Sequence, residues 1–334
     1  MHPRSRTRLS DVLTRQDDVI TFAQVVDAGA DAGLPAREVA GGRWQQLCVG
    51  IYLASTDPAT DRQWAWCAQL RGDEGGVVTG AHVCRMRGVG DVPDLPATVL
   101  VSEDCQRTEL PGVQCRRTSR PAEFHEDKGL RLAGTTRAIV DAARQCASLQ
   151  DVRGLIMASL NGKHTTAAAL RRELDDGPRR GSGWCRRALD DWDDGARSAP
   201  EAEAADWLRD EVRAGRCPPF LLNPTVVIDG VELGSPDIYV PGTALGNEMD
   251  SRRHHGSDND LDATLLRHRR FADHALVLEH VTPARFRRDR AGWARTFAAL
   301  ADGRRHLGDP AGLVVKPAGP LQPVHGRRRR SPSA

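Results

Sequence analysis

Two short segments, residues 235–240 and 245–250, most constrain what this chain can fold into. Each carries apolar side chains at alternate positions, which predicts two strands paired in a hairpin. Asp237 begins the first strand, while Glu248 and Asp250 end the second and share one face because they stand two residues apart. Pairing of these strands therefore predicts three convergent carboxylates.

These three carboxylates have the chemistry of a metal site. Mg²⁺ and Mn²⁺ prefer hard oxygen ligands, and such ions activate water and stabilise charge during phosphodiester cleavage. The alternative is that these are ordinary surface acids, because turns and strand ends at a protein surface commonly carry Asp and Glu. His254 and His255 follow shortly after the segment.

The residues on both sides of this hairpin predict further elements in a definite order. They are a helix capped by Ser198 with Glu201 in its first turn, a strand over 221–228 leading into the Asp229-Gly230 turn, a helix over 260–272, a strand over 275–281 and a helix capped by Thr282. The predicted order over residues 196–305 is αβββαβα.

This order, with Glu201 in the first helix and the carboxylates on the hairpin, resembles the PD-(D/E)XK restriction-endonuclease-like superfamily, in particular its very-short-patch-repair-like branch. The resemblance implies a metal-dependent DNA endonuclease. Asp237 and Glu248 would then hold Mg²⁺ or Mn²⁺, and Asp250 would be a second ligand or a base that orients water. Glu201 would be an outer ligand, and His254 or His255 could relay a proton.

The chain departs from the superfamily pattern at its third position. A Lys usually stands there, whereas this sequence has Asp250, which fits the very-short-patch-repair-like branch; Ser251 replaces the Gly usual in that branch. A Lys-dependent mechanism is therefore not expected. A restriction-endonuclease-like fold retained without catalysis is the alternative.

The first 60 residues carry a second signal. Residues 9–14 predict a short amphipathic helix, Thr21 and Gln24 have the spacing of a helix capping box, residues 34–39 predict a helix that stops at Gly41-Gly42, and residues 43–53 predict two short strands around a turn. This succession predicts a winged helix-turn-helix.

The Gly41-Gly42-Arg43-Trp44 break and the Gly50-Ile51-Tyr52 end of the wing resemble the N-terminal domain of the AbiEi family of antitoxins. The resemblance implies DNA as a partner, together with a toxin protein. In winged helices the third helix enters the major groove. The residues nominated for DNA contact are Arg37, Arg43 and Gln45, with Arg4, Arg6 and Arg8 as a possible arm.

The charge of these 60 residues weakens the prediction of DNA binding. Residues 1–60 hold six Arg against seven Asp and Glu, so the basic surplus of a strong DNA binder is missing. A winged domain used for protein contact is the alternative.

The remaining sequence predicts packing rather than chemistry. Residues 61–195 predict an α/β linking region, with strands over 95–101 and 113–117 and helices after Gly134, over 152–160 and over 165–174. The acidic run 190–194 is interpreted as a solvated face. Residues 306–334 are rich in Pro and Gly and end in a basic run, which predicts a disordered tail that adds attraction to phosphate.

Composition sets the class of protein. The chain has 334 residues and eight Cys without a C-x-x-C pair, which argues against a zinc site and a small disulfide framework and favours reduced thiols in the cytoplasm. No apolar run is long enough for a membrane helix or a signal peptide. We therefore expect a multidomain α/β protein. It has two candidate functions: a metal-dependent DNA endonuclease that its N-terminal winged helix-turn-helix positions on DNA, or an antitoxin or transcriptional regulator whose nuclease-like domain is inactive.

Overall fold

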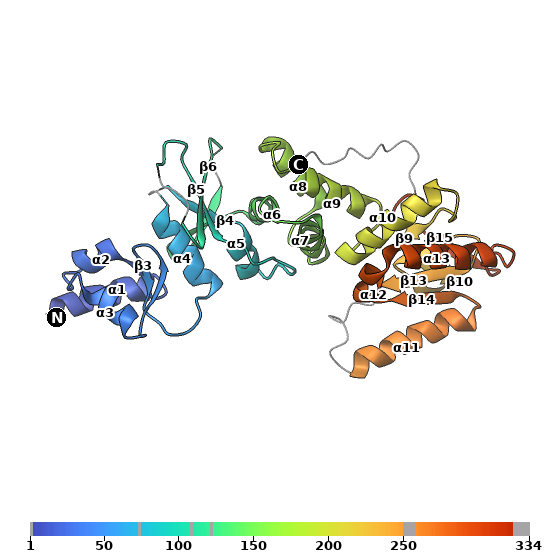
Figure 1. Cartoon of the computed structure of the whole chain (residues 1–334), viewed down its shortest axis with the longest axis horizontal. Coiled ribbons are helices and arrows are strands. Elements are labelled where there is room, and N and C mark those ends of the chain that lie inside the picture. The colour runs from blue at the N-terminus through green and yellow to red at the C-terminus, as the bar shows by residue number, and fades with distance from the viewer. Residues whose placement is uncertain (1–2, 73–74, 107–109, 121–122, 250–257, 323–334) are drawn as a thin grey trace. The chain divides into compact units, whose positions relative to one another are not determined.

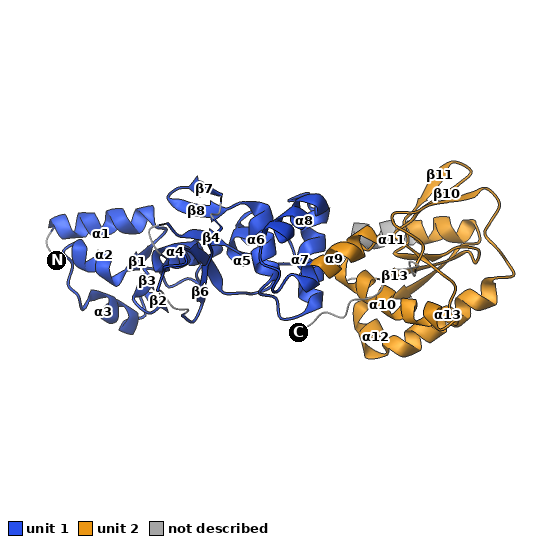
Figure 2. Cartoon of the chain, turned by 90° about the horizontal axis from the view of Figure 1, so that it is seen from above, with its two compact units in different colours: residues 1–185 blue, residues 186–334 orange. Residues whose placement is uncertain are grey.

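The protein is a mixed α/β chain that divides into two compact units, residues 1–185 and residues 186–334 (Figure 2). The computed structural model describes residues 3–72, 75–106, 110–120, 123–249 and 258–322, with side chains in α11 described from Leu266 onward. We expected the C-terminal domain to begin at residue 196, whereas the second unit begins within α9 (Gly183–Asp193). The units are called the first and second unit below, and residues 1–60 of the first are called the head.

The head contains three helices and one small antiparallel sheet (Figure 1). Its elements are α1 (Pro3–Arg15), β1 (Val19–Thr21), α2 (Phe22–Asp27), α3 (Leu34–Ala40), β2 (Gln45–Cys48) and β3 (Ile51–Leu53), with strand order β1-β3-β2. The predicted capping box is confirmed, because Thr21 Oγ1 accepts from the Gln24 backbone N–H and the Gln24 side chain accepts from the Thr21 N–H. Leu9, Ile20 and Val25 form the small core.

The prediction of an arm before the first helix is wrong. Helix α1 begins at Pro3, so Arg4, Arg6 and Arg8 lie on a regular helix instead. Pro is favoured in the first turn of a helix and Arg is a good helix former, so nothing in this segment stops the helix from extending toward the N-terminus.

The rest of the first unit is built on a five-stranded mixed sheet with strand order β6-β5-β4-β8-β7. Its elements are α4 (Asp61–Arg71), β4 (Val77–Thr79), α5 (Ala81–Met86), β5 (Ala97–Val101), β6 (Val113–Arg117), β7 (Phe124–Asp127), β8 (Leu130–Ala133), α6 (Thr135–Ala143), α7 (Leu149–Asn161) and α8 (Ala167–Asp176). The predicted strands and helices of this region are confirmed, whereas no range was predicted for α4, β4, α5, β7 or β8. Arg62 of α4 ties the head to this sheet through Asp17 at 2.8 Å and Asp127 at 2.6 Å.

The second unit has a four-stranded sheet with strand order β14-β13-β12-β9. Its strands are β9 (Leu221–Leu222), β12 (Ile238–Val240), β13 (Leu245–Met249) and β14 (Val277–Val281), and its helices are α10 (Ala199–Arg213), α11 (Asp258–Asp273), α12 (Pro283–Arg288) and α13 (Arg290–Arg304). Strands β9, β12 and β13 are antiparallel neighbours, while β14 runs parallel to β13. Helices α10 and α13 pack together on one face of the sheet and α11 covers the other (Figure 1).

A separate three-stranded sheet, with strand order β11-β10-β15, corrects one prediction and confirms another. The predicted strand over 221–228 divides at Asn223, whose φ of +46° turns the chain, into β9 and β10 (Thr225–Ile228) of different sheets. The predicted turn at Asp229-Gly230 is confirmed and joins β10 to β11 (Val231–Gly234).

The prediction that the whole segment after residue 306 is disordered is wrong for its described part. Strand β15 (Leu313–Lys316) pairs antiparallel with β10 and packs Leu313 and Val315 against the core of the unit. Gln322 is buried and bridges to Phe220. The basic run Arg327 to Arg330 lies outside the described residues.

The interpretation of residues 190–194 as a solvated face is also wrong for two members. Asp191 is fully buried and Asp194 is 5% exposed. Arg209 of α10 binds Asp194 at 3.1 Å, and Arg187 binds Asp191 at 3.1 Å, so each buried charge has a cation beside it.

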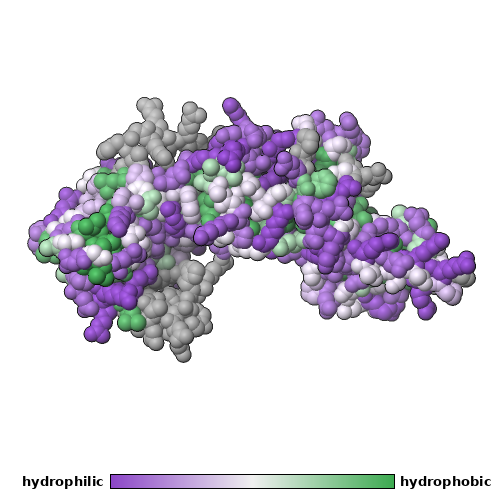
Figure 3. All heavy atoms as spheres, turned by 180° about the vertical axis from the view of Figure 1, so that it is seen from behind, coloured by the Kyte–Doolittle hydropathy of each residue, from purple (hydrophilic) through white to green (hydrophobic). Residues whose placement is uncertain are grey.

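The surface drawn in Figure 3 is mostly hydrophilic, with small hydrophobic patches scattered among polar side chains. None of the described helices has the length and apolar character needed to cross a membrane.

Candidate active site

Glu201 enters the site from the first turn of α10 because Ser198 caps that helix. Its carboxylate is held at both oxygens: Oε1 accepts from Ser198 Oγ at 2.6 Å, and Oε2 accepts from the Arg197 backbone N–H at 2.8 Å and from Asn223 Nδ2 at 2.5 Å. Burial raises the pKa of Glu201, while these hydrogen bonds favour the ionised form. Glu201 is thus fixed in place by its neighbours.

The β12–β13 hairpin brings Asp237 and Glu248 side by side. The register pairs Ile238 with Asn247 and Val240 with Leu245, so the next pair outward is Asp237 with Glu248. Residues directly opposite each other in an antiparallel pair project from the same face. The Asp237 side chain is fixed by the Met249 N–H, which donates to Oδ2 at 2.6 Å. We call these two residues the carboxylate pair.

The pKa of Asp237 is raised by burial and by two neighbouring carboxylates. Burial raises its pKa well above the usual range, and the negative charges of Glu201 and Glu248 raise it further. The Met249 N–H and Arg267 act in the opposite direction without cancelling the effect. Because the native state holds the proton more tightly than the unfolded chain, ionised Asp237 destabilises the fold at neutral pH, and this cost disappears as the pH falls through the raised pKa toward the ordinary value.

Glu248 meets a cation from the helix that covers this face. Its side chain is 7% exposed, and its Oε2 accepts from Arg267 Nη2 of α11 at 3.0 Å. The parallel register places His280 of β14 beside Glu248, and the His280 ring packs on His268 with 3.9 Å between centroids. Sequence reasoning did not find Arg267, His268 or His280, because no local spacing links them to the hairpin.

Three predicted site residues, Asp250, His254 and His255, lie outside the described residues. Within the part of the chain that is described, no three His, Cys, Asp or Glu side chains are grouped as a set of metal ligands. The structure therefore brings together Asp237 and Glu248 with Glu201 beside them, and the expected third ligand remains a prediction.

The residues nominated for DNA contact in the head are largely engaged within the protein. Arg37 pairs with Asp31 at 2.6 Å, and Arg43 makes two hydrogen bonds to the Glu38 carboxylate at 2.6 and 3.0 Å. Gln45 Nε2 donates to the backbone oxygens of Ser55 and Asp57. Arg4, Arg6 and Arg8 are exposed on α1.

Comparisons with known proteins give no family assignment. No family model and no curated protein matches the chain. Among solved structures, it is similar to the crystal structure of the RV2827C protein from Mycobacterium tuberculosis, with 16% identity and a TM-score of 0.33 over 57% of this chain and 78% of that one. A likeness at this level assigns neither fold nor function.

Proposed function

We propose that this chain is a cytoplasmic DNA-associated protein whose second unit is a metal-dependent DNA endonuclease domain of the PD-(D/E)XK type. The observation that carries the proposal is the carboxylate pair: two acids lie opposite each other on one sheet face, where burial first, and then the negative charges of Glu201 and Glu248, raise the pKa of Asp237. The eight cysteines are free thiols, which supports a reducing compartment.

The arrangement of the second unit supports the proposal. A helix, three antiparallel strands, a helix, a parallel fourth strand and further helices follow one another as α10, β9, β12, β13, α11, β14 and α12–α13. The inserted β10–β11 hairpin belongs to a different sheet and leaves this core order intact.

The residues of the site fit a divalent cation. Asp237 and Glu248 supply hard carboxylate oxygens, and Asp237 Oδ1 accepts no hydrogen bond from any described residue. These two would hold Mg²⁺ or Mn²⁺, with Asp250 as the proposed third ligand and Glu201 as an outer one. The ion would activate water and stabilise the charge that develops on the phosphate. Arg267, which is 38% exposed beside Glu248, would place its guanidinium against a phosphate oxygen.

This proposal is tested by incubating the full chain with supercoiled, linear and single-stranded DNA in Mg²⁺ or Mn²⁺, with a chelator as control. Nicking that requires the ion supports it. If the chain cuts none of these substrates, the endonuclease proposal fails.

One observation favours the alternative function, an antitoxin or transcriptional regulator with an inactive nuclease-like domain. Arg267 already neutralises Glu248, and both oxygens of Glu201 are hydrogen-bonded, so these carboxylates are satisfied in part without an ion. Under this alternative the second unit would hold DNA or a toxin protein rather than cleave DNA.

The head is proposed to be a winged helix-turn-helix. Its element order, three helices with β1-β3-β2 pairing and a short turn between β2 and β3, supports this. Phe22 and Val26 are exposed one turn apart on α2 at 43% and 44%, which keeps open a use of the head in protein contact.

We expect the α1 arginines to contribute more to DNA binding than Arg37. Arg37 is already paired with Asp31, so Arg37→Gln should weaken DNA binding less than about threefold. Replacing Arg4, Arg6 and Arg8 by Gln removes up to three phosphate contacts, and the slope of log affinity against log salt should fall by about 2 to 3. Fluorescence anisotropy of the full chain on duplex DNA at several salt concentrations measures both.

A matched control carries the same charge change on exposed arginines outside the head, at Arg172, Arg213 and Arg305. If this control lowers the salt slope as much as the α1 variant, binding follows total charge. The head would then be assigned to protein contact.

A further inference from the structure

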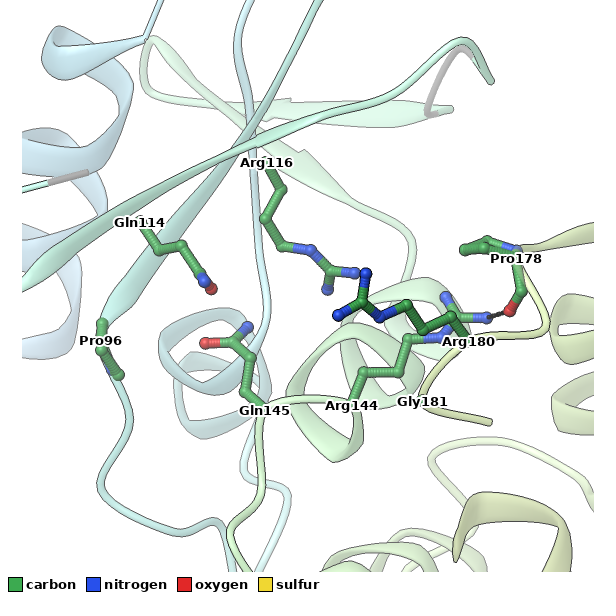
Figure 4. A pocket seen from close by; sticks show the side chains of 8 residues that line it. All are labelled: Pro96, Gln114, Arg116, Arg144, Gln145, Pro178, Arg180 and Gly181. Atoms are coloured by element: carbon green, nitrogen blue, oxygen red, sulfur yellow. Dashed lines mark hydrogen bonds between the residues drawn. The ribbon is translucent and has the colours of Figure 1, made fainter. Parts of the chain in front are cut away.

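A pocket in the first unit has no part in the proposed cleavage. It encloses about 610 Å³ beside β5 and β6, the end of α6 and the segment that follows α8 (Figure 4). Its lining residues are Pro96, Gln114, Arg116, Arg144, Gln145, Pro178, Arg180 and Gly181. A volume of this size is within the range of about 300 to 1,000 Å³ that small-molecule sites occupy.

The pocket has a surplus of positive charge. Arg116 and Arg144 share one buried carboxylate, Asp141, at 3.4 and 3.6 Å, and Arg137 binds the same carboxylate at 2.7 Å. Among the described residues, no carboxylate pairs with Arg180. Figure 4 shows the guanidinium groups of Arg116 and Arg180 pointing toward one another. Like charges that converge in this way are stabilised by an anion between them.

Arg144 supplies a buried donor at the wall of the pocket. Its side chain is only 3% exposed, and Nη2 donates to the Pro178 backbone oxygen at 3.1 Å. Its buried Nε has no hydrogen-bond acceptor among the described residues, and its buried Nη1 lies 3.6 Å from Asp141 Oδ1, which is beyond hydrogen-bond distance. A buried donor without an acceptor costs free energy, and an anion in the pocket would supply the acceptor.

The other walls suit an organic group attached to that anion. Gln145 is held in place, because its Nε2 donates to Thr98 Oγ1 and to the Asp141 backbone oxygen, both at 3.1 Å. Figure 4 shows the amides of Gln114 and Gln145 on the side of the pocket away from Arg180. The Gln114 amide can pair with base edges or hydroxyl groups, while Gln145 offers its Oε1 as an acceptor because both of its N–H groups are already donated. Pro96 and Pro178 add apolar surface.

We propose that this pocket binds a nucleotide through its 5′-phosphate, with Arg116, Arg144 and Arg180 holding the phosphate oxygens and Gln114 and Gln145 facing the nucleoside. Three guanidinium groups match a phosphomonoester, whose three terminal oxygens each accept charge-assisted hydrogen bonds. The same chemistry comes from a free mononucleotide or from the 5′ end of a strand. The proposal is independent of the carboxylate pair in the second unit.

Isothermal titration calorimetry of the full chain at physiological salt tests it with four probes: AMP, adenosine, inorganic phosphate and a 5′-phosphorylated thymidine tetranucleotide. We expect one AMP per chain, and adenosine binding at least tenfold weaker. Loss of charge-assisted hydrogen bonds predicts that Arg180→Gln weakens AMP binding about tenfold or more, and that the Arg116→Gln, Arg180→Gln double variant weakens it further. A tetranucleotide that binds more tightly than AMP identifies the source as a strand end; the reverse order identifies a free nucleotide.

Arg179→Gln is the matched control, because Arg179 is exposed next to Arg180 but does not line the pocket. Its AMP affinity should stay within twofold of the parent chain. The proposal is overturned if AMP does not bind, if adenosine binds as tightly as AMP, or if Arg179→Gln weakens binding as much as Arg180→Gln.

Discussion

The Asp237→Asn and Glu248→Gln variants are each expected to lose metal-dependent nicking of supercoiled DNA by a factor of about 10² or more. Each substitution removes the charge of one member of the carboxylate pair, and two hard ligands on one face are what would hold the ion. The changes preserve side-chain shape, so the fold should be retained. Nicking rates of the full chain in Mg²⁺ and in Mn²⁺ give the comparison.

Glu232→Gln provides the control for this result. Glu232 is an exposed acid on β11 of the same unit, so its loss changes the net charge equally without reaching the pair. Its nicking rate should equal that of the parent chain. Equal cutting by the parent chain and by the Asp237→Asn and Glu248→Gln variants would show that the carboxylates are not catalytic. It would favour the alternative function as an antitoxin or transcriptional regulator.

The Arg209→Met variant is expected to destabilise the second unit by about 3 to 5 kcal/mol, because it removes the cation beside the buried Asp194 carboxylate. Arg209 is 4% exposed and binds Asp194 at 3.1 Å and Asp206 at 3.0 Å. Its Nε also donates to Gln322 at 2.8 Å and so ties down the segment after β15. For a unit of this size the loss lowers the Tm by about 10 °C, measured by thermal unfolding of the full chain.

The Arg213→Met variant tests whether the burial of Arg209 is the reason for the expected loss of stability. Arg213 lies on the same helix and is 42% exposed, and its ion pair among the described residues is with the exposed Asp210, at 2.7 Å. A surface pair of this kind contributes about 0 to 1 kcal/mol, so the Tm should hardly change. Similar Tm values for both variants would contradict the role given to the buried network.

Local signals predicted local structure correctly. The Thr21–Gln24 capping box, the Ser198 cap and the Asp229-Gly230 turn depend on residues a few positions apart, and all three form as expected. Helix α4 was missed because Ala65 to Ala68 are buried consecutively. A helix buried around most of its circumference loses the periodic pattern on which sequence reasoning depends.

Longer-range pairing explains the other differences. Strand β15 pairs with β10 about 90 positions earlier along the chain, so its Pro- and Gly-rich surroundings suggested disorder. The run at 190–194 looked solvated because Arg209, which satisfies the buried Asp194, comes from a different helix.

The candidate site shows the same division between local contacts, which could be predicted, and long-range contacts, which could not. Alternation and spacing within one hairpin were enough to place Asp237 beside Glu248. Arg267 and His280 reach Glu248 only through the packing of α11 and the parallel pairing of β13 with β14. Neither of these contacts leaves a signal in the local sequence.

The most direct test of a metal site at the carboxylate pair is the thermal stability of the full chain and its Asp237→Asn variant, with and without Mn²⁺. Because the pKa of Asp237 is raised, the variant should be the more stable of the two at pH 7 in chelator, and this difference should shrink as the pH falls toward 5. Saturating Mn²⁺ should raise the Tm of the parent chain, since a ligand at about 100 times its Kd stabilises by about 2.7 kcal/mol, and should leave the variant unchanged. A parent chain that does not respond to Mn²⁺, or a variant that responds equally, would contradict the assignment of the ion to this pair.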